Sequence, residues 1–322
     1  MFGREGGARM RVETIEPHGF CSGVTVAVKK AEAALARTGV VYCLHDLVHN
    51  ETVVERMRAA GLRFVASLAE VPSGATVLLS AHGTGPEVRA EAEQRGLAVV
   101  DATCPFVARV HRQVCAYAAR KLPVVVVGHA THVEVMGVVS EARAAGAQVA
   151  VVAKPEEVAQ VPFPSGAAIG VVCQTTLSGE QVQAVLAALR TRYPAFETTP
   201  SADVCTATRD RQEAVRAFVA GGGDGVLVLG SATSSNTRRL AEIAEQAGAR
   251  VWCALDEKAL ENIDFSGISR LGITSGASTP EEVFGNVKLR MENVECLPGK
   301  DASQVLSTKG MEKSWGQASA SR

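Results

Sequence analysis

The feature that most limits the fold of this chain is an internal repeat, in which three blocks of about a hundred residues carry the same parts in the same order. Each block has a cysteine followed at once by a helix-like stretch, and then two units of apolar strand, polar loop and helix. A repeat of this length predicts one supersecondary unit used three times. The cysteine segments span 19–35, 101–121 and 203–220, and the strand–loop–helix units span 40–57, 75–93, 123–142, 167–186, 225–244 and 268–287.

The apolar runs of the repeat indicate the class of sheet. Runs such as ATVLLS, PVVVVG and GVLVLG are rich in Val and Leu and alternate with stretches rich in Ala, Glu and Arg. Continuous apolar strands that alternate with helices are typical of parallel sheets covered on both faces. We therefore predict an α/β fold of three similar parallel-sheet domains around a pseudo-threefold axis. The predicted domains are 1–103, 104–202 and 203–298, followed by a flexible tail at 299–322 that has little apolar content.

Charge and hydropathy narrow the partners that this chain can have. The formal net charge is −1 over 322 residues, so no basic surface for nucleic acid is indicated. No apolar run is long enough for a membrane-spanning helix, and the first residues lack the apolar core of a signal peptide. We expect a cytoplasmic protein that binds neither nucleic acid nor a membrane.

Three of the eight cysteines stand apart from the rest by their place in the repeat. Cys21, Cys104 and Cys205 each open a helix, where the helix dipole favours the thiolate form that binds metal. A buried structural cysteine is the usual interpretation of one such residue, but three in matching positions predict a shared thiolate site. Soft thiolates select an iron–sulfur cluster, zinc or copper(I). The other five, none of them in a CxxC pair, are interpreted as structural: Cys43, Cys115, Cys173, Cys253 and Cys296.

Polar loops after the strands predict an anion site. In parallel sheets, ligands sit beyond the carboxyl ends of the strands, where these loops fall. Donors of this kind at helix N-termini favour phosphate, although each one alone is typical of an ordinary helix cap. The chain has no P-loop and no GxGxxG, so a site of diphosphate size is favoured over a nucleoside triphosphate site. The residues predicted to form it are His49, His82, His132, Ser234, Ser235, Asn236 and Ser278.

Two further residues are candidates for moving protons. Glu134 follows His132 by two positions, and burial would raise its pKa into the range of a general acid. Thr175 lies in the QTTLS loop and could relay a proton through its hydroxyl group. Both residues also fit ordinary roles at a helix start. His18, His45, His111 and His129 have weaker contexts and receive no role.

Taken together, the motifs of the chain resemble one known family. GFCSGV, LVHN, SAHG, DATCP, GHATHVE, QTTLS, DVCTATRDRQ, GSATSSN and GITSGASTPE occur in this order between about residues 11 and 297. This combination resembles the 4-hydroxy-3-methylbut-2-enyl diphosphate reductases, the last enzymes of the methylerythritol phosphate route to isoprenoids. The resemblance implies a trefoil-like α/β fold of three domains around a central [4Fe-4S] cluster.

The resemblance also implies roles for individual residues. Cys21, Cys104 and Cys205 would hold the cluster and leave its fourth iron open to the substrate. Glu134 would deliver protons, and Thr175 would hydrogen-bond the hydroxyl group of the substrate. The diphosphate would be held by the three histidines, Ser234, Ser235, Asn236 and Ser278. The implied reaction is a reductive dehydroxylation that gives isopentenyl and dimethylallyl diphosphate, with ferredoxin or flavodoxin as electron donor.

The chain departs from the usual family pattern at several positions near these residues. Thr25 and Val26 stand where an Asp–Arg pair is usual, Val133 replaces a Pro, MGVVS replaces a GT–G pattern, and CTATRDRQ replaces CYATQNRQ. No proposed ligand is lost, but residues around metal ligands orient them. A divergent paralogue with an altered substrate therefore stays an alternative. Others are a quinolinate synthase-like or aconitase-type cluster enzyme and a non-catalytic metal or redox sensor.

Overall fold

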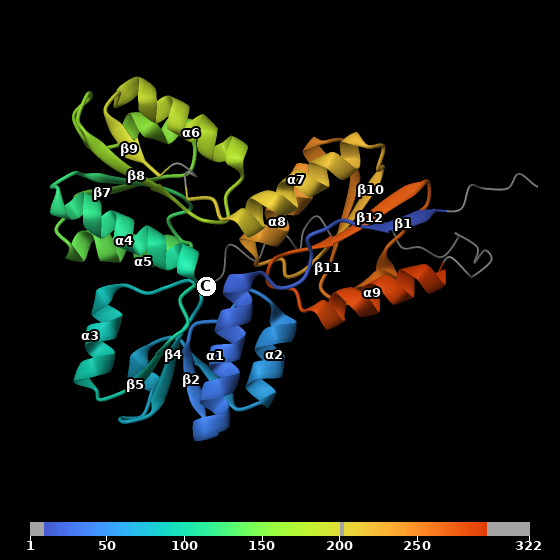
Figure 1. Cartoon of the computed structure of the whole chain (residues 1–322), viewed down its shortest axis with the longest axis horizontal. Helices are drawn as coiled ribbons and strands as arrows, with labels where there is room; N and C mark the ends of the chain where they lie inside the picture. The colour runs from blue at the N-terminus through green and yellow to red at the C-terminus, as the bar shows by residue number, and fades with distance from the viewer. Residues whose placement is uncertain (1–9, 200–202, 295–322) are drawn as a thin grey trace, which may run out of the picture. The chain divides into compact units, whose positions relative to one another are not determined.

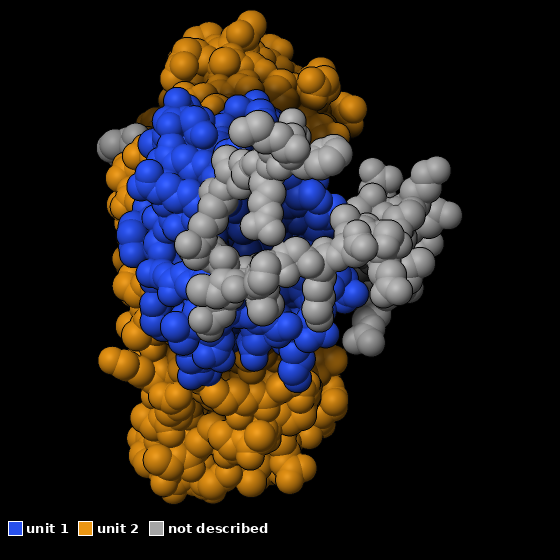
Figure 2. All heavy atoms as spheres, turned by 90° about the vertical axis from the view of Figure 1, so that its right-hand side faces the viewer, with its two compact units in different colours: residues 1–19, 214–322 blue, residues 20–213 orange. Residues whose placement is uncertain are grey.

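The computed structural model describes residues 10–199 and 203–294 of the chain. Internal contacts divide the chain into two compact units, which Figure 2 colours separately. Unit 1 consists of residues 1–19 and 214–322, and unit 2 of residues 20–213. The two units are described in turn.

Unit 2 contains two four-stranded sheets in which every strand pair is parallel. The strands are short and mostly buried, and all four valines of β6 lie in the core, as expected for a parallel sheet with helices on both faces. The spatial order in the first sheet is β3 (Leu62–Val65), β2 (Val41–Leu44), β4 (Thr76–Leu79) and β5 (Ala98–Asp101). In the second sheet it is β7 (Val149–Val152), β6 (Val124–Val127), β8 (Ile169–Cys173) and β9 (Phe196–Thr198).

The helices of unit 2 connect these strands and cover the sheets (Figure 1). Small side chains such as Ala27, Ala31 and Ala34 are fully buried in the core that α1 shares with the first sheet, so backbone and sheet approach closely. Helices α4 and α5 pack against each other, and α3 contacts α5. The helices are α1 (Ser22–Thr38), α2 (Glu51–Ala59), α3 (Pro86–Gln94), α4 (Pro105–Ala119), α5 (Val133–Ala144) and α6 (Gly179–Arg192), with 3₁₀ turns η1 (Leu68–Glu70) and η2 (Pro155–Gln160).

Unit 1 contains the third sheet, which is also parallel throughout. Helix α7 (Thr206–Ala220) crosses from unit 2 into unit 1, and its residues Val215 and Phe218 pack in one core with Val226 of the third sheet. The spatial order is β1 (Arg11–Thr14), β12 (Arg270–Ser275), β10 (Gly225–Leu229) and β11 (Arg250–Ala254). The remaining elements of this unit are α8 (Ser235–Gln246), η3 (Ala259–Asn262) and α9 (Glu281–Val294).

The three sheets share one strand order, which explains the repeat in the sequence. In each sheet the first strand of the block takes the second position. The next two strands of the block lie on either side of it, and a fourth strand forms the edge beside the last of them. That fourth strand is β5 in the first sheet and β9 in the second, whereas in the third it is β1 from the N-terminal end of the described chain. Each fourth strand leads directly to one of the three helix-opening cysteines. The cysteines therefore occupy matching positions in the topology.

These observations confirm the predicted fold class of three parallel-sheet α/β domains. The runs PVVVVG and GVLVLG form β6 and β10 as predicted, and a helix follows each cysteine turn. The domain limits at 103, 202 and 298 stay predictions, and Cys296 and the predicted tail at 299–322 lie outside the described residues. Among the described helices, none has the length and apolar character needed to span a membrane.

Candidate active site

The three predicted cluster ligands each lie at the start of a helix. Cys21 caps α1, and its Sγ accepts the backbone N–H of Val24 at 3.4 Å. Cys205 accepts the backbone N–H of Thr208 at 3.3 Å. Cys104 caps α4 just before Pro105, which suits the first helical turn because its missing N–H is not needed there. All seven described cysteines are free thiols.

Contacts around Gly23 show that the cysteines lie near one another within unit 2. A Cβ at Gly23 would lie 2.5 Å from the Sγ of Cys104 and 3.9 Å from that of Cys21. The thiols of Cys21 and Cys205 both help to raise the pKa of Cys104, so all three groups are within electrostatic reach. Glycine is therefore the residue that leaves room between two of the thiols.

The spacing of these thiols bears on the kind of metal that they fit. Among the described residues, no three His, Cys, Asp or Glu side chains converge on one position where a single ion would bind. An iron–sulfur cluster bonds each cysteine through a different iron, so its ligands stand apart, and it is held by thiolates. Three neighbouring cysteine thiols are therefore a donor set that fits such a cluster.

One expectation about the thiols was wrong. The helix starts were expected to lower the thiol pKa, but the pKa values of Cys104 and Cys205 are raised. Burial is the largest cause in both, because it disfavours the charged thiolate, and it outweighs the backbone N–H groups that act the other way. The positive charge of bound iron is what would offset this cost.

Three histidine rings meet in unit 2, each from a different loop. The ring of His49 lies 4.2 Å from that of His82 and 5.7 Å from that of His132, and the latter two are 6.2 Å apart, measured between centroids. His49 precedes the cap of α2, His82 follows β4, and His132 caps α5. The carboxyl ends of β2 and β4 in the first sheet and of β6 in the second thus bring together side chains up to 83 residues apart, from His49 to His132.

The electrostatics of this cluster suit an anionic ligand. The pKa of His82 is well below its usual value, first because of burial and then because of the neighbouring His49 and His132. An anion between the rings would reverse the second cause, since it favours their protonated forms. Ser80, which the sequence did not single out, lies 3.3 Å from the Nδ1 of His82 through its hydroxyl oxygen and orients that ring.

Glu134 is buried beside Thr175. The carboxylate accepts the backbone N–H of Thr175 at 2.7 Å and its hydroxyl group at 3.1 Å. Burial, the largest cause, raises the pKa of Glu134 to about 7, against the two hydrogen bonds, which lower it. Such a carboxyl can hold a proton near neutral pH and give it up, which is what a general acid needs.

Contacts on either side of Glu134 link the histidines to a cysteine. The backbone N–H of Glu134 donates to the Nδ1 of His132 at 3.2 Å. On the other side, the carbonyl oxygen of Thr175 accepts the backbone N–H of Cys205 at 3.2 Å. A continuous series of contacts therefore runs from His132 through Glu134 and Thr175 to Cys205.

Asp203 is a further residue of this region that sequence reasoning missed. Its carboxylate is fully buried and accepts the N–H of Cys173 at 3.0 Å and the hydroxyl group of Thr199 at 2.8 Å. It also contributes to the raised pKa of Glu134. The sequence signal was an aspartate two residues before a predicted ligand, Cys205, in DVC.

The four remaining residues predicted to bind diphosphate lie in unit 1. Ser234 caps α8 through its hydroxyl group, and the side-chain oxygen of Asn236 accepts the N–H of Ala277 at 3.0 Å, next to Ser278. The Ser235 hydroxyl is buried without a hydrogen-bond partner among the described residues, which marks it as available to a ligand.

The departures from the family pattern leave these positions intact. Thr25 donates its hydroxyl group to the carbonyl oxygen of Cys21 at 3.0 Å, one turn into α1, and Val26 is 38% exposed. Val133 takes the first helical position of α5, where Pro is favoured but not required, and the helix still begins there. Cys21 and His132 therefore still cap α1 and α5 beside the replaced residues.

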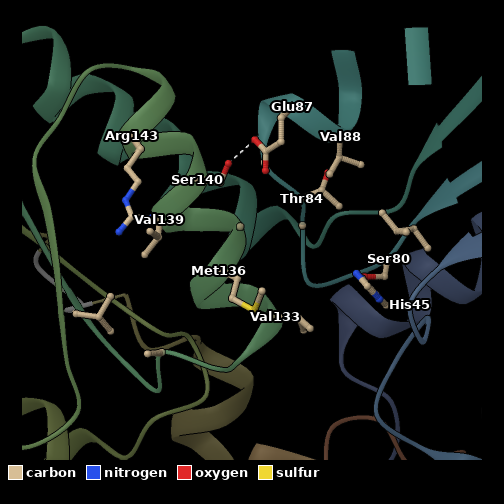
Figure 3. A pocket seen from close by; sticks show the side chains of 16 residues that line it. His45, Ser80, Thr84, Glu87, Val88, Val133, Met136, Val139, Ser140 and Arg143 are labelled. Atoms are coloured by element: carbon tan, nitrogen blue, oxygen red, sulfur yellow. Dashed lines mark hydrogen bonds between the residues drawn. The ribbon is translucent and has the colours of Figure 1, made fainter. Parts of the chain in front are cut away.

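Unit 2 contains a pocket of about 470 Å³ whose lining includes chain neighbours of His82 and His132 (Figure 3). Its walls include Ser80 and Gly83, on either side of His82 in the chain, and Val133, which follows His132. The size is within the range of small-molecule sites, which span about 300–1,000 Å³. Two of the lining residues bond each other: Ser140 of α5 donates its hydroxyl group to the Glu87 carboxylate of α3 (Figure 3).

Comparison with known proteins places the chain in a family. The model of the LytB protein family matches residues 12–292. The chain belongs to the LytB family. This match also favours the reductase interpretation over a quinolinate synthase or an aconitase-type dehydratase.

Curated LytB relatives carry one enzyme name. The chain is 39% identical over 293 residues to the 4-hydroxy-3-methylbut-2-enyl diphosphate reductase of Magnetococcus marinus, covering 89% of this chain and 94% of that protein. It is 41% identical over 281 residues to the enzyme of the same name from Chlamydia trachomatis, covering 86% and 90%.

Solved structures of LytB-type enzymes show the same fold. The reductase structure from Plasmodium falciparum, named for E-1-hydroxy-2-methyl-but-2-enyl-4-diphosphate, superposes with a TM-score of 0.83 at 27% identity, covering 97% of this chain and 99% of that one. A second structure, described as (E)-4-hydroxy-3-methyl-but-2-enyl diphosphate reductase of the non-mevalonate pathway, gives a TM-score of 0.65 at 32% identity, covering 89% and 100%.

Proposed function

We propose that this chain reduces 4-hydroxy-3-methylbut-2-enyl diphosphate to isopentenyl and dimethylallyl diphosphate. Two electrons and two protons enter, and the allylic C–O bond breaks. One proton leaves with the hydroxyl group as water, and the other is added to the allylic carbon chain. The LytB relatives are named for a reductase of this substrate.

The observation that carries this proposal is the series of contacts around Glu134. One buried carboxyl, with a pKa of about 7, stands between His132 and the Thr175–Cys205 contact. Dehydroxylation of an alcohol needs a proton at the departing oxygen, because hydroxide is a poor leaving group. Glu134 is the acid that supplies it, and the Thr175 hydroxyl group orients the carboxyl.

Cys21, Cys104 and Cys205 would hold the iron–sulfur cluster, which supplies the two electrons one at a time and an open iron that polarises the hydroxyl group. Their matching positions after the fourth strands support one shared cluster for each chain, and the resemblance to the reductase family implies the [4Fe-4S] type. Gly23 keeps two of these ligands free of steric conflict.

The polar loops of each unit offer donors suited to a diphosphate. In unit 2 the rings of His49, His82 and His132 offer donors whose protonation an anion would favour. In unit 1 the N-terminus of α8 and the unpartnered Ser235 hydroxyl offer more donors, together with Ser234, Asn236 and Ser278.

The electrons come from a small redox protein, ferredoxin or flavodoxin, through a transient contact. This partner and the free thiols of the described cysteines both favour a reducing compartment, the cytoplasm.

Product analysis tests the proposal. The protein is reconstituted with iron and sulfide without oxygen, reduced, and supplied with the allylic diphosphate. Formation of both five-carbon diphosphates, in proportion to enzyme, is expected. Absence of both products from a preparation with an intact cluster would overturn the proposed function.

A further inference from the structure

His111 lies outside the residues proposed to act on the substrate, yet it is built into the same part of unit 2. It stands two turns after Cys104 on α4 and is only 6% exposed. Its Nδ1 lies 3.2 Å from a carboxylate oxygen of Glu141 on α5. Burial lowers the pKa of His111, against the hydrogen bond and charge of Glu141, which raise it. Because a carboxylate can only accept, Nδ1–H donates to Glu141.

Glu141 holds this ring from a helix that also begins the active site. α5 opens with His132 and Glu134, and Glu141 follows two turns later. The same carboxylate lies 3.5 Å from the guanidinium of Arg89 on α3 and accepts from the Cys115 thiol at 3.6 Å. Glu141 therefore ties together α3, α4 and α5, and the His111 ring is one of three groups that it orients.

The opposite edge of the His111 ring packs against backbone. A Cβ at Gly83 would lie 3.0 Å from its Nε2, and a Cβ at Gly137 would lie 3.5 Å from its Cε1. Gly83 follows His82 directly and has φ +77°, and Gly137 lies five residues after His132. Nε2 is buried with no hydrogen-bond partner among the described residues, so this edge acts by contact.

We propose that His111 is a positioning residue for diphosphate binding, whose ring, oriented by Glu141, supports the loop of His82 and the first turns of α5. This inference rests on the proposed function, since it assumes that His82 and His132 bind diphosphate. The ring edge lies against Gly83, beside His82, and against Gly137, on α5 after His132. Moving it shifts both histidines relative to each other.

Four variants separate the contact made by the edge of the His111 ring from the hydrogen bond that the ring donates to Glu141. His111→Asn keeps an N–H near the position of Nδ1 but removes the edge that meets Gly83 and Gly137. Glu141→Leu removes the acceptor, whereas Glu141→Gln keeps an oxygen there. Cys115→Ser is the matched control, because Cys115 contacts the same carboxylate from the same helix but does not touch the His82 loop.

The measurement is calorimetric binding of inorganic diphosphate to the reconstituted holoprotein, with steady-state kinetics alongside. His111→Asn is expected to weaken diphosphate binding and raise KM about tenfold, with kcat changed less than about twofold, as for a ligand group displaced by a fraction of an ångström. Glu141→Leu should weaken binding in the same direction, and Glu141→Gln should restore it. Cys115→Ser should bind as the unaltered protein does.

The outcomes distinguish this inference from the proposed function. Binding by His111→Asn that matches the unaltered protein overturns the inference, and so does an equal loss in Cys115→Ser. Should His111→Asn fail to fold, the Glu141 pair decides, because equal affinity in Glu141→Leu and Glu141→Gln also overturns it. Altered diphosphate affinity in a protein that makes no five-carbon product would leave the inference standing and reject the reductase. Failure of the unaltered holoprotein to bind diphosphate would reject the inference.

Discussion

Thr175 holds both oxygens of the Glu134 carboxylate, one through its backbone N–H at 2.7 Å and the other through its hydroxyl group at 3.1 Å. Both hydrogen bonds favour the charged carboxylate, yet burial prevails and the pKa of Glu134 rises to about 7. Near pH 7 the protonated and ionised forms of Glu134 are therefore present in similar amounts. This balance gives the acid a proton to donate and a means to be recharged.

The pH dependence of the rate follows from this pKa. The acid form of Glu134 is the active form, so kcat/KM should be constant with respect to this group at lower pH and fall as the pH rises through about 7. Above this pH, each further pH unit should lower kcat/KM about tenfold. Glu134→Gln should keep its iron and lose about a hundredfold or more in kcat, since general acids contribute about 10²–10⁴. Full turnover in that variant would reject the role.

Thr175→Val tests the hydroxyl half of the contact. Loss of a hydrogen bond that lowers the pKa of Glu134 should move the alkaline fall in kcat/KM upward by about one pH unit. Thr175→Ser keeps the hydroxyl group and should keep the original profile. The comparison is a pH–rate measurement of the three proteins, and an unshifted profile in Thr175→Val would contradict the assigned contact.

The cysteines should separate into two groups on substitution. Serine at Cys21, Cys104 or Cys205 should each reduce bound iron and sulfide and abolish turnover, because each would hold one iron. Serine at Cys115 or Cys253 should leave the iron content unchanged. Iron and sulfide analysis with electron paramagnetic resonance of the reduced protein checks this, and a full cluster in Cys104→Ser would count against the ligand set.

Gly23→Ala probes the space between two ligands. The added methyl group would lie 2.5 Å from the Sγ of Cys104, so either the thiol or the start of α1 must move. Cluster content after reconstitution should fall severalfold, although alanine is the better helix former. Gly39→Ala, at a position with open space but φ +71°, is a control for backbone strain alone. Equal iron in Gly23→Ala and the unaltered protein would show that the thiols do not need this room.

The repeat could be predicted from the sequence because each of its parts is recognised by a short local pattern. Apolar runs such as PVVVVG and the helix starts after Cys21 and Cys104 depend on neighbouring residues, and the structure has them where they were predicted. The place of Arg11–Thr14 was not visible, since this four-residue strand pairs with Arg270–Ser275 across the length of the chain.

In the candidate site, too, local features could be predicted from the sequence and features that depend on distant residues could not. Loop positions of His49, His82 and His132 follow from strand ends, and their ring separations required the structure. The roles given to these histidines stay predictions. The raised pKa of Cys104 could not be predicted from its helix start, because burial depends on residues far away in sequence. Asp203 was missed for the same reason, since its partner Cys173 lies 30 residues earlier in the chain, on β8.

The most direct test of the central claim is whether the substrate reaches the metal held by the three cysteines. Glu134→Gln holoprotein is suited to this, because it should bind the allylic diphosphate without converting it. Mössbauer spectra of iron-57-labelled protein, recorded before and after substrate is added, should show a change at one iron site and none at the three held by cysteine. Spectra that stay identical with saturating substrate would contradict the claim that this site is where the alcohol is reduced.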